Sequence, residues 1–343
     1  MIVGKTLGAD SLAAVGSTSI IIYFVFCFIN GFTGGFGICL GQKCGAKDEK
    51  GMRKSVAVSA LLSIAFTVVL TLICCLLSHQ ILRWMQIPAD ISGEAYDYMF
   101  VVLLGTGATV FYNMISNMLR ALGDSKTPLY FLVFSSVLNI FLDILFIVPF
   151  HMGVAGAGWA TFIAQGISAL LVMIKLVFSK EIYKVEFKDI SIDMPILKKI
   201  IEIGIPTALQ QSIVSFSNVI VQSYINSFGA NAVAGYTSYV KIDGFLQLPI
   251  QSFAMAITTF TGQNIGAHAI DRVKKGLRTT MAMTFGVTTI GVLIIYIFGE
   301  QLVGIFSSDP EVIKYGYLMA RIFAAGYLTL PVIQIISGAL RGV

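Results

Sequence analysis

The chain alternates long apolar runs with short polar connections. Each run covers 23 to 30 residues, and a helix needs roughly 20 apolar residues to cross a hydrocarbon core. The pattern therefore predicts nine membrane-spanning helices. They cover residues 11–40, 55–77, 95–119, 128–150, 154–178, 200–226, 232–261, 276–298 and 312–338.

These runs are continuously apolar and contain many glycines. Strands of membrane barrels instead alternate apolar and polar residues over about ten positions, so a barrel is excluded. The composition supports a membrane protein, since 56% of the residues are hydrophobic and 12% are charged, against about 25% charged in soluble domains. The sequence predicts an all-α polytopic membrane protein.

Basic residues gather in alternate connections. Residues 41–54, 120–127, 175–199 and 262–278, together with Arg341, hold 18 of the 23 lysines and arginines. Basic loops stay in the cytoplasm, so these connections are expected there. The net charge of +5 is explained by this topology, and no basic patch on a soluble module suggests nucleic-acid binding. The five cysteines and three histidines have no metal-ligand spacing.

An internal repeat organises the chain. Residues 8–122 align without a gap with residues 229–343, at an offset of 221, and 23 of the 115 positions are identical. The identities cluster at 8–10, 41–46 and 115–120 of the first copy. Six predicted spans separate equivalent positions, so both copies face the same way, as in transporters built from parallel repeats.

The repeat also predicts how the chain divides. We expect an N-terminal lobe at 1–178, a charged cytoplasmic linker at 179–199 and a C-terminal lobe at 200–343. The run at 200–226 precedes the second copy and would have its counterpart before Met1, and the runs at 128–150 and 154–178 lack second-copy partners. We therefore expect nine of twelve spans here, with the first and the last two missing.

Several motifs, in order, resemble the multidrug and toxic compound extrusion (MATE) family. They are L-G-A-D-S-L-A-A-V-G at 7–16, G-Q-K-C-G-A-K-D at 41–48, L-R-A-L-G-D-S-K-T-P at 119–128, N-x-x-x-D at 139–143 and G-V-A-G-A-G-W-A-T at 153–161. The resemblance implies a two-lobe bundle of six-helix repeats in the bacterial inner membrane. It also implies export of small organic, often cationic, compounds by antiport with H+ or Na+ and alternating access. We expect a monomer with no cofactor other than the coupling ion.

Polar residues inside two neighbouring spans form a candidate ion site. Asn139 and Asp143 are four residues apart and share one helix face. Counting from the ends of their runs, Asp143 and Thr161 both lie roughly 10 Å below the outer surface. Carboxylate, amide and hydroxyl oxygens suit Na+, and the same carboxylate could hold a proton. The alternative is that Asp143 is a structural carboxylate satisfied by Asn139 and a neighbouring helix, and that Asn139 and Thr161 form ordinary hydrogen bonds between helices.

The family resemblance assigns the same three residues to a cation site in the N-terminal lobe. One branch of the family adds an aspartate on the first helix, which this chain lacks. The other branch uses carboxylates on the seventh and tenth helices, and the corresponding runs here contain only Glu202, at the cytoplasmic edge. We therefore expect coupling at Asp143, Asn139 and Thr161.

The second copy contains charged residues inside its spans. Lys241 and Asp243 face different directions, so we expect Asp243 to pair with Arg321 rather than with Lys241. An organic cation could instead be bound in a cavity lined by polar and aromatic residues, although ordinary interhelical packing would also explain them. The candidates are Lys241, Asp243, Tyr236, Tyr239, Gln247, Gln251, Arg321, Gln210 and Gln211. Close helix packing is expected at Gly31, Gly34, Gly35 and Gly37, and a kink at Pro249.

Two other function classes were considered. A lipid-linked saccharide flippase of the same superfamily would need several arginines or lysines around one cavity, and only Lys241 and Arg321 offer that charge. A membrane-embedded enzyme would need paired acids or a nucleophile beside a base within the spans, and the sequence has none. We therefore do not expect an enzyme.

Overall fold

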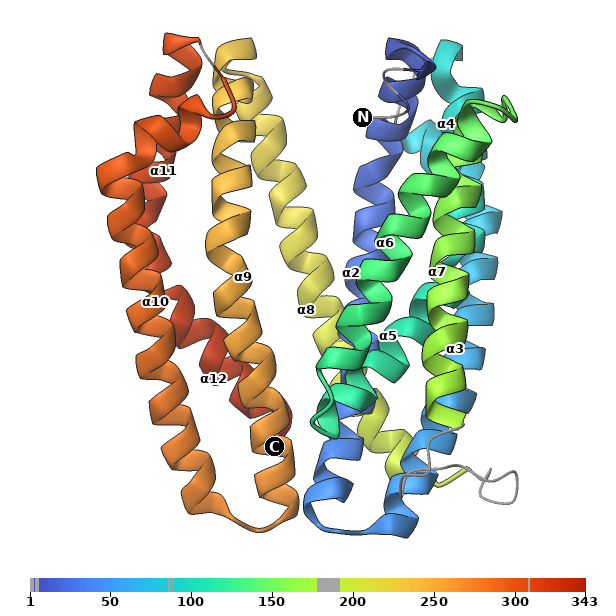
Figure 1. Ribbon diagram of the computed structural model, residues 1–343, viewed down its shortest axis with the longest axis vertical. Helices are drawn as coiled ribbons and strands as arrows, with labels where there is room; N and C mark the ends of the chain where they lie inside the picture. Colours follow the sequence, from blue (N-terminus) through green and yellow to red (C-terminus); the bar gives the residue numbers. More distant parts are fainter. Residues whose placement is uncertain (1–2, 4–5, 86, 88, 178–191, 308) are drawn as a thin grey trace. The chain divides into compact units, whose positions relative to one another are not determined.

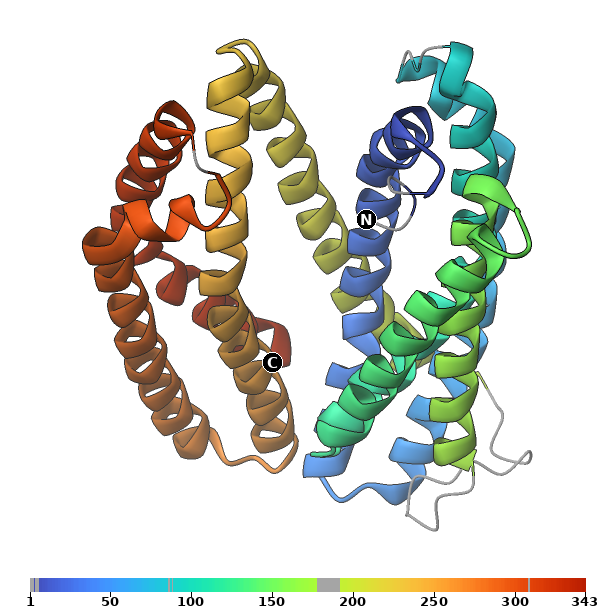
Figure 2. The same ribbon diagram turned by 45° about the horizontal axis from the view of Figure 1, so that its top comes forward.

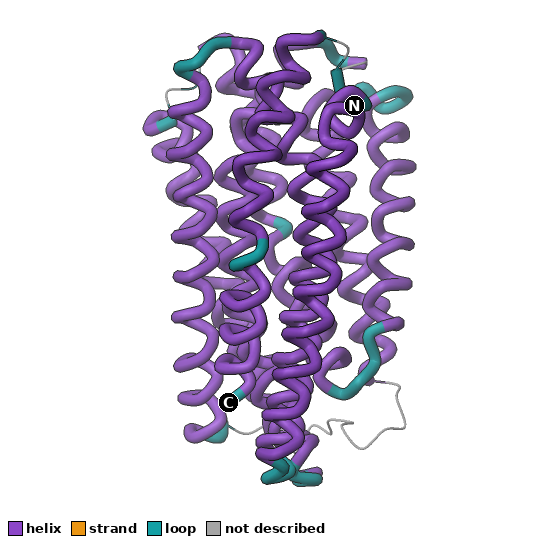
Figure 3. The backbone as a smooth tube through the Cα atoms, turned by 90° about the vertical axis from the view of Figure 1, so that its left-hand side faces the viewer, coloured by secondary structure: helices purple, strands orange, loops and turns teal. Residues whose placement is uncertain are grey.

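The computed structural model describes residues 3, 6–85, 87, 89–177, 192–307 and 309–343, and the regular elements among them are all helices (Figure 3). The chain divides into two compact units, with the boundary at Ser215 and Phe216 inside one helix. Most of the predicted linker, residues 178–191, lies outside the described residues, and the next helix begins at Met194.

The first unit contains α2 to α7 and the first part of α8 (Figure 1). Their bounds are α2 Ala9–Gly45, α3 Glu49–Trp84, α4 Ala89–Leu104, α5 Thr106–Ala121, α6 Lys126–Ile147, α7 Gly153–Val177 and α8 Met194–Asn226. Helices α6 and α7 lie side by side along their lengths in both Figure 1 and Figure 2. Helix α7 also packs on α4 and α5, so it connects α6 to the rest of this unit.

The second unit contains the rest of α8 and four further helices. They are α9 Ala230–Gly266, α10 Ile270–Gly304, α11 Pro310–Tyr327 and α12 Leu330–Gly342. Helix α9 packs against α10, α11 and α12. It therefore forms the centre of this unit, and the side chains along α9 decide which groups the other helices meet.

The helix boundaries confirm the internal repeat. Helices α2 and α9 begin 221 residues apart and also end 221 residues apart, and α3 and α10 begin at the same offset. Both copies break their last span beside an equivalent glycine, Gly105 and Gly326. The turns after α2 and α9 match as well, since Lys47 and His268 have φ angles of 54° and 55°.

A side-chain cap distinguishes the two copies at the next helix. Asp48 precedes α3, and its carboxylate accepts a hydrogen bond from the Gly51 backbone N–H at 2.8 Å and one from Lys43 Nζ at 3.2 Å. These partners hold the pKa of Asp48 below its usual value. The equivalent residue before α10 is Ala269, which has no side-chain cap.

The outward helix faces are apolar. On α6, Val133, Val137 and Phe141 are more than half exposed and follow one another at helical spacing. Water would not support such a surface, whereas lipid would. Among the described residues, six helices are long and apolar enough to span a membrane, if α4 and α5 are counted as one. The pair α11 and α12 is bent by 49°, and it makes a seventh span if it too is counted as one.

The predicted number of nine spans is therefore not confirmed. All nine predicted runs fall on helices, but α8 and α9 are not among the helices that pass this test of length and apolarity. The physical reason is their polar content, since α9 contains Lys241, Asp243, Gln247 and Gln251 within about three turns.

Candidate functional site

The interface between α6 and α7 contains both apolar and polar contacts. Leu142, Ala160 and Ala164 are buried together at its centre. Towards the start of α6, Ser135 Oγ donates to the Ala164 carbonyl oxygen at 3.0 Å, and Ser168 Oγ donates to the Phe131 carbonyl at 3.3 Å. Side-chain hydrogen bonds to backbone across the interface fix the two helices in register.

This register brings two of the predicted ion-site residues together. Asn139 Nδ2 lies 3.4 Å from Thr161 Oγ1, and Thr161 Oγ1 donates to the Ala157 carbonyl oxygen at 3.0 Å. Both side chains are half-buried. The contact joins α6 and α7 one turn from Asp143.

Asp143 lies one turn further along α6 and is also half-buried. Its Oδ1 atom is buried and has no hydrogen-bond partner among the described residues, and Asn139 donates to Thr161 rather than to it. A carboxylate oxygen buried without a partner is costly. Asn139 is thus not the hydrogen-bond partner of this oxygen.

One neighbour of Asp143 was not predicted. Tyr98 on α4 interacts electrostatically with the Asp143 carboxylate. Since α4 packs on α7, a third helix contributes to this region. The sequence places Tyr98 in an apolar run, but only the packing of α4 on α7 brings it to α6.

The second unit contains a separate polar network around Asp243 of α9. Tyr327, the last residue of α11, donates a hydrogen bond to Asp243 Oδ1, and Gln247 Nε2 lies 3.1 Å from Asp243 Oδ2. The Tyr327 hydroxyl also lies 2.9 Å from the Tyr239 hydroxyl. Tyr239 and Tyr327 are both buried. Asp243 is therefore a hydrogen-bond centre between α9 and α11.

The predicted pairing of Asp243 with Arg321 is wrong, because Tyr327 and Gln247 occupy the carboxylate instead. Arg321 is exposed, and its backbone carbonyl accepts a hydrogen bond from Tyr296. Tyr327 lies six residues beyond Arg321 and thus points to a different side of α11. As expected, Lys241 does not pair with Asp243; its Nζ lies 4.9 Å from the centre of the Phe306 ring.

One of the remaining cavity candidates adjoins this network. Tyr236 stacks at a tilt against Tyr239, with ring centres 5.9 Å apart. Gln210, Gln211 and Gln251 are exposed. Tyr327 was not predicted from the sequence, because its approach to Asp243 depends on the packing of α11 against α9.

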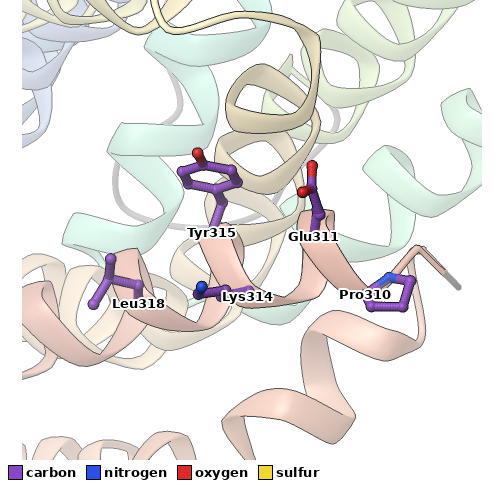
Figure 4. A pocket seen from close by; sticks show the side chains of 5 residues that line it. All are labelled: Pro310, Glu311, Lys314, Tyr315 and Leu318. Carbon is purple, nitrogen blue, oxygen red and sulfur yellow. The ribbon is translucent and has the colours of Figure 1, made fainter.

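A shallow hollow of about 370 Å³ lies elsewhere in this unit, at the start of α11. Five α11 side chains line it (Figure 4): Pro310, Glu311, Lys314, Tyr315 and Leu318. Asn231 Nδ2 lies 2.5 Å from Glu311 Oε2 beside it. The hollow contains none of the predicted site residues.

Apolar outward faces, repeated helices and polar groups buried between spans define a multi-pass membrane transport protein. The sequence model of the MatE family matches residues 1–145 and 206–343. The chain belongs to this family of MATE multidrug transporters, which are secondary transporters and not enzymes.

Curated relatives agree with this assignment. The chain is 29% identical to the probable multidrug resistance protein YoeA of Bacillus subtilis, covering 99% of this chain and 75% of the relative. It is 30% identical to the probable multidrug resistance protein YpnP of the same organism, covering 99% and 76%.

Solved structures show the same fold. One is the outward-facing conformation of a multidrug resistance MATE family transporter, with a TM-score of 0.91 and 26% identity over 99% of this chain and 76% of that one. Another is a MOP superfamily transporter from Pyrococcus furiosus, with the same score, identity and coverage.

Proposed function

We propose that this protein exports small organic, often cationic, compounds in exchange for inward H+ or Na+ by alternating access. Membership of the MatE family and the multidrug names of the relatives support this function. The bacterial relatives support a location in the inner membrane. The substrate class is extended to this chain by similarity, and the coupling site is argued from its own residues.

The observation that carries the proposal is the buried oxygen of Asp143. Within the part of the chain that the structure describes, Oδ1 has no hydrogen-bond partner, although it lies within a membrane-spanning helix. A proton or a sodium ion on this oxygen would remove the cost of that burial. An unpaired carboxylate of this kind suits a group that gains and loses a cation during each cycle.

Asn139 and Thr161 supply the further ligands in this proposal. Their side-chain oxygens are hard donors of the kind that bind small cations, and their mutual contact at 3.4 Å keeps them one turn from Asp143. A cation bound there would add contacts between α6 and α7. An ion can shift a conformational equilibrium only if it binds one state more tightly than the other. In the proposed mechanism the outward-facing state is the one that binds the ion more tightly. Ion binding to Asp143 favours the outward-facing state and release of the substrate.

The test is ethidium efflux from cells that express the protein, with and without an inward Na+ gradient. Asp143→Asn keeps the size of the side chain and removes its charge, and we expect efflux to fall at least tenfold. Asp90→Asn is the matched control, because Asp90 is an exposed carboxylate in the first turn of α4 in the same unit.

Each outcome is decisive. Loss of efflux in the Asp143 variant alone supports the coupling site, and dependence on the Na+ gradient identifies the ion. If Asp143→Asn pumps as well as the wild type, Asp143 is structural and the proposed mechanism is wrong. The flippase alternative is not favoured, since Lys241 lies over Phe306 and Arg321 is exposed on α11.

A further inference from the structure

The carboxylate of Asp243 is surrounded by neutral groups. Tyr327 and Gln247 donate hydrogen bonds to it, and the hydroxyls of Tyr236 and Tyr239 interact with it electrostatically. Asp243 itself remains half-buried rather than enclosed. Its oxygens therefore have hydrogen-bond partners, although the residue as a whole is not closed off from the molecular surface.

Positive side chains in this unit are directed elsewhere. Lys241 lies two residues away on α9 and contacts the Phe306 ring, and Arg321 is exposed on α11. Within the described ranges, the ion pairs do not include Asp243. A negative charge inside a membrane bundle is costly and is normally paired, so the missing positive charge is expected from a ligand.

The internal repeat shows that the fold does not require this carboxylate. The residue equivalent to Asp243 in the first copy is Ile22, which is buried with 7% exposure in an apolar core that includes Val102. The residues equivalent to Tyr239 and Tyr327 are Thr18 and Thr106. The Thr18 hydroxyl donates to carbonyls of its own helix, and the Thr106 hydroxyl, at the start of α5, donates to the Leu103 carbonyl at the end of α4. In the first copy, the corresponding contact between α2 and α4 is therefore made by apolar packing.

The rings beside Asp243 indicate the kind of cation. Tyr239 stacks on Phe323 with ring centres 5.2 Å apart, and Phe323 is 48% exposed. Tyr236 is half-buried beside them. Aromatic faces next to a carboxylate attract large cations with delocalised charge. A small hydrated ion would gain little from these rings.

The geometry points to a recognition site for a monovalent organic cation on the second unit, formed by Asp243 with Tyr236, Tyr239, Gln247, Phe323 and Tyr327. Asp243 supplies the opposite charge, and the rings of Tyr236 and Phe323, which are not buried, contact the apolar body of the ligand, with Tyr239 packed behind Phe323. Tyr327 and Gln247 hold the carboxylate in position. This inference rests on the proposed export of organic cations and assigns the recognition of their charge to one carboxylate, separate from Asp143.

Equilibrium binding to the purified full chain tests the inference. Tetraphenylphosphonium serves as the cation, and triphenylphosphine oxide as a neutral probe of similar shape, both measured by titration calorimetry without an ion gradient. We expect the cation to bind more tightly than the neutral probe. Asp243→Asn should weaken cation binding at least tenfold and leave the neutral probe within about threefold. Asp271→Asn, which removes an exposed carboxylate from the same unit, should change neither.

A second variant distinguishes loss of the binding site from misfolding of the protein. Asp243→Ile introduces the residue that the first copy has at this position, and gel filtration and thermal melting report whether it folds. Folded Asp243→Ile should also lose cation binding. The inference is overturned if either folded variant keeps its cation affinity, or if Na+ competes with tetraphenylphosphonium in the wild type but not in Asp243→Asn. Failure here leaves the efflux result at Asp143 standing, because that experiment measures coupling and this one measures binding.

Discussion

Gly31→Ala tests how closely α2 and α8 approach each other in the first unit. A Cβ atom at Gly31 would lie 2.5 Å from Ala208 Cα, 2.7 Å from its backbone nitrogen and 2.8 Å from the Thr207 carbonyl oxygen. Carbon atoms in contact normally lie about 3.5–4.0 Å apart. All three neighbours are backbone atoms, so the helices would have to separate by roughly 1 Å.

The expected cost can be bounded. Overpacking of this kind costs about 1–3 kcal/mol, and the better helix propensity of alanine returns up to about 1 kcal/mol. Because all three neighbours are backbone atoms, we place the overpacking cost at about 2–3 kcal/mol. We therefore expect Gly31→Ala to lower stability by about 1–2 kcal/mol, which corresponds to a fall in Tm of about 2–8 °C.

The same helix supplies a matched control. A Cβ atom at Gly34 would have nothing within 4 Å, so Gly34→Ala should leave the Tm unchanged or raise it. Both variants are purified in the same detergent, and unfolding is followed by a thiol-reactive fluorescent dye, which reports exposure of the buried cysteines. If Gly31→Ala melts at or above the wild-type temperature, the close approach of α2 to α8 at this position is refuted.

Two further predictions concern residues outside the spans. Asp48→Ala should destabilise the protein by about 1 kcal/mol at pH 7, because the cap at the Gly51 backbone N–H is lost. Ala269→Asp should stabilise it, because Ala269 has nearly the same backbone angles as Asp48 (φ −97°, ψ 60° against φ −87°, ψ 84°). Thermal melting checks both variants, and a Tm equal to that of the wild type in both would contradict the prediction. Lys54 Nζ donates to Asp193 at 3.0 Å and thereby lowers the pKa of Asp193. A carboxylate whose pKa is lowered in the folded state stabilises the protein above the usual aspartate pKa of about 3.9, and this stabilisation is lost as the pH falls through the folded-state pKa. The Tm difference between the wild type and Asp193→Asn should therefore be present at pH 6 and vanish in strong acid. A Tm difference that does not change with pH would exclude the ion pair as its cause.

The sequence predicts a similar depth for Asp143 and Thr161, because each lies seven residues from the end of its run and the two runs are joined by a short turn. In the structure Thr161 contacts Asn139, one turn from Asp143 on α6. The neighbours of Asp143 were harder to predict. Tyr98 comes from α4, and only the packing of α4 on α7 brings it near α6.

The wrong predictions have one physical cause, which is that the sequence does not fix how far each helix is rotated about its own axis. Gly31 and Gly34 are three residues apart and were both expected at a close crossing, but only Gly31 meets α8 closely. Arg321 and Asp243 were matched by depth, yet Tyr327 takes the position beside the carboxylate. Depth follows from counting residues at a constant rise, whereas the side that a residue presents depends on how its helix is packed.

The sequence by itself determined the helices, the offset of 221 residues between the two copies and the membrane environment, because these follow from apolar run length and from identity at a fixed spacing. Only the tertiary structure decided which polar groups meet. The bend of 49° between α11 and α12 follows directly after Tyr327, whose hydroxyl reaches Asp243. Such a contact joins residues 84 positions apart. This contact depends on the rotation of the helices about their axes and on the bend between α11 and α12, and neither can be predicted from the local sequence pattern.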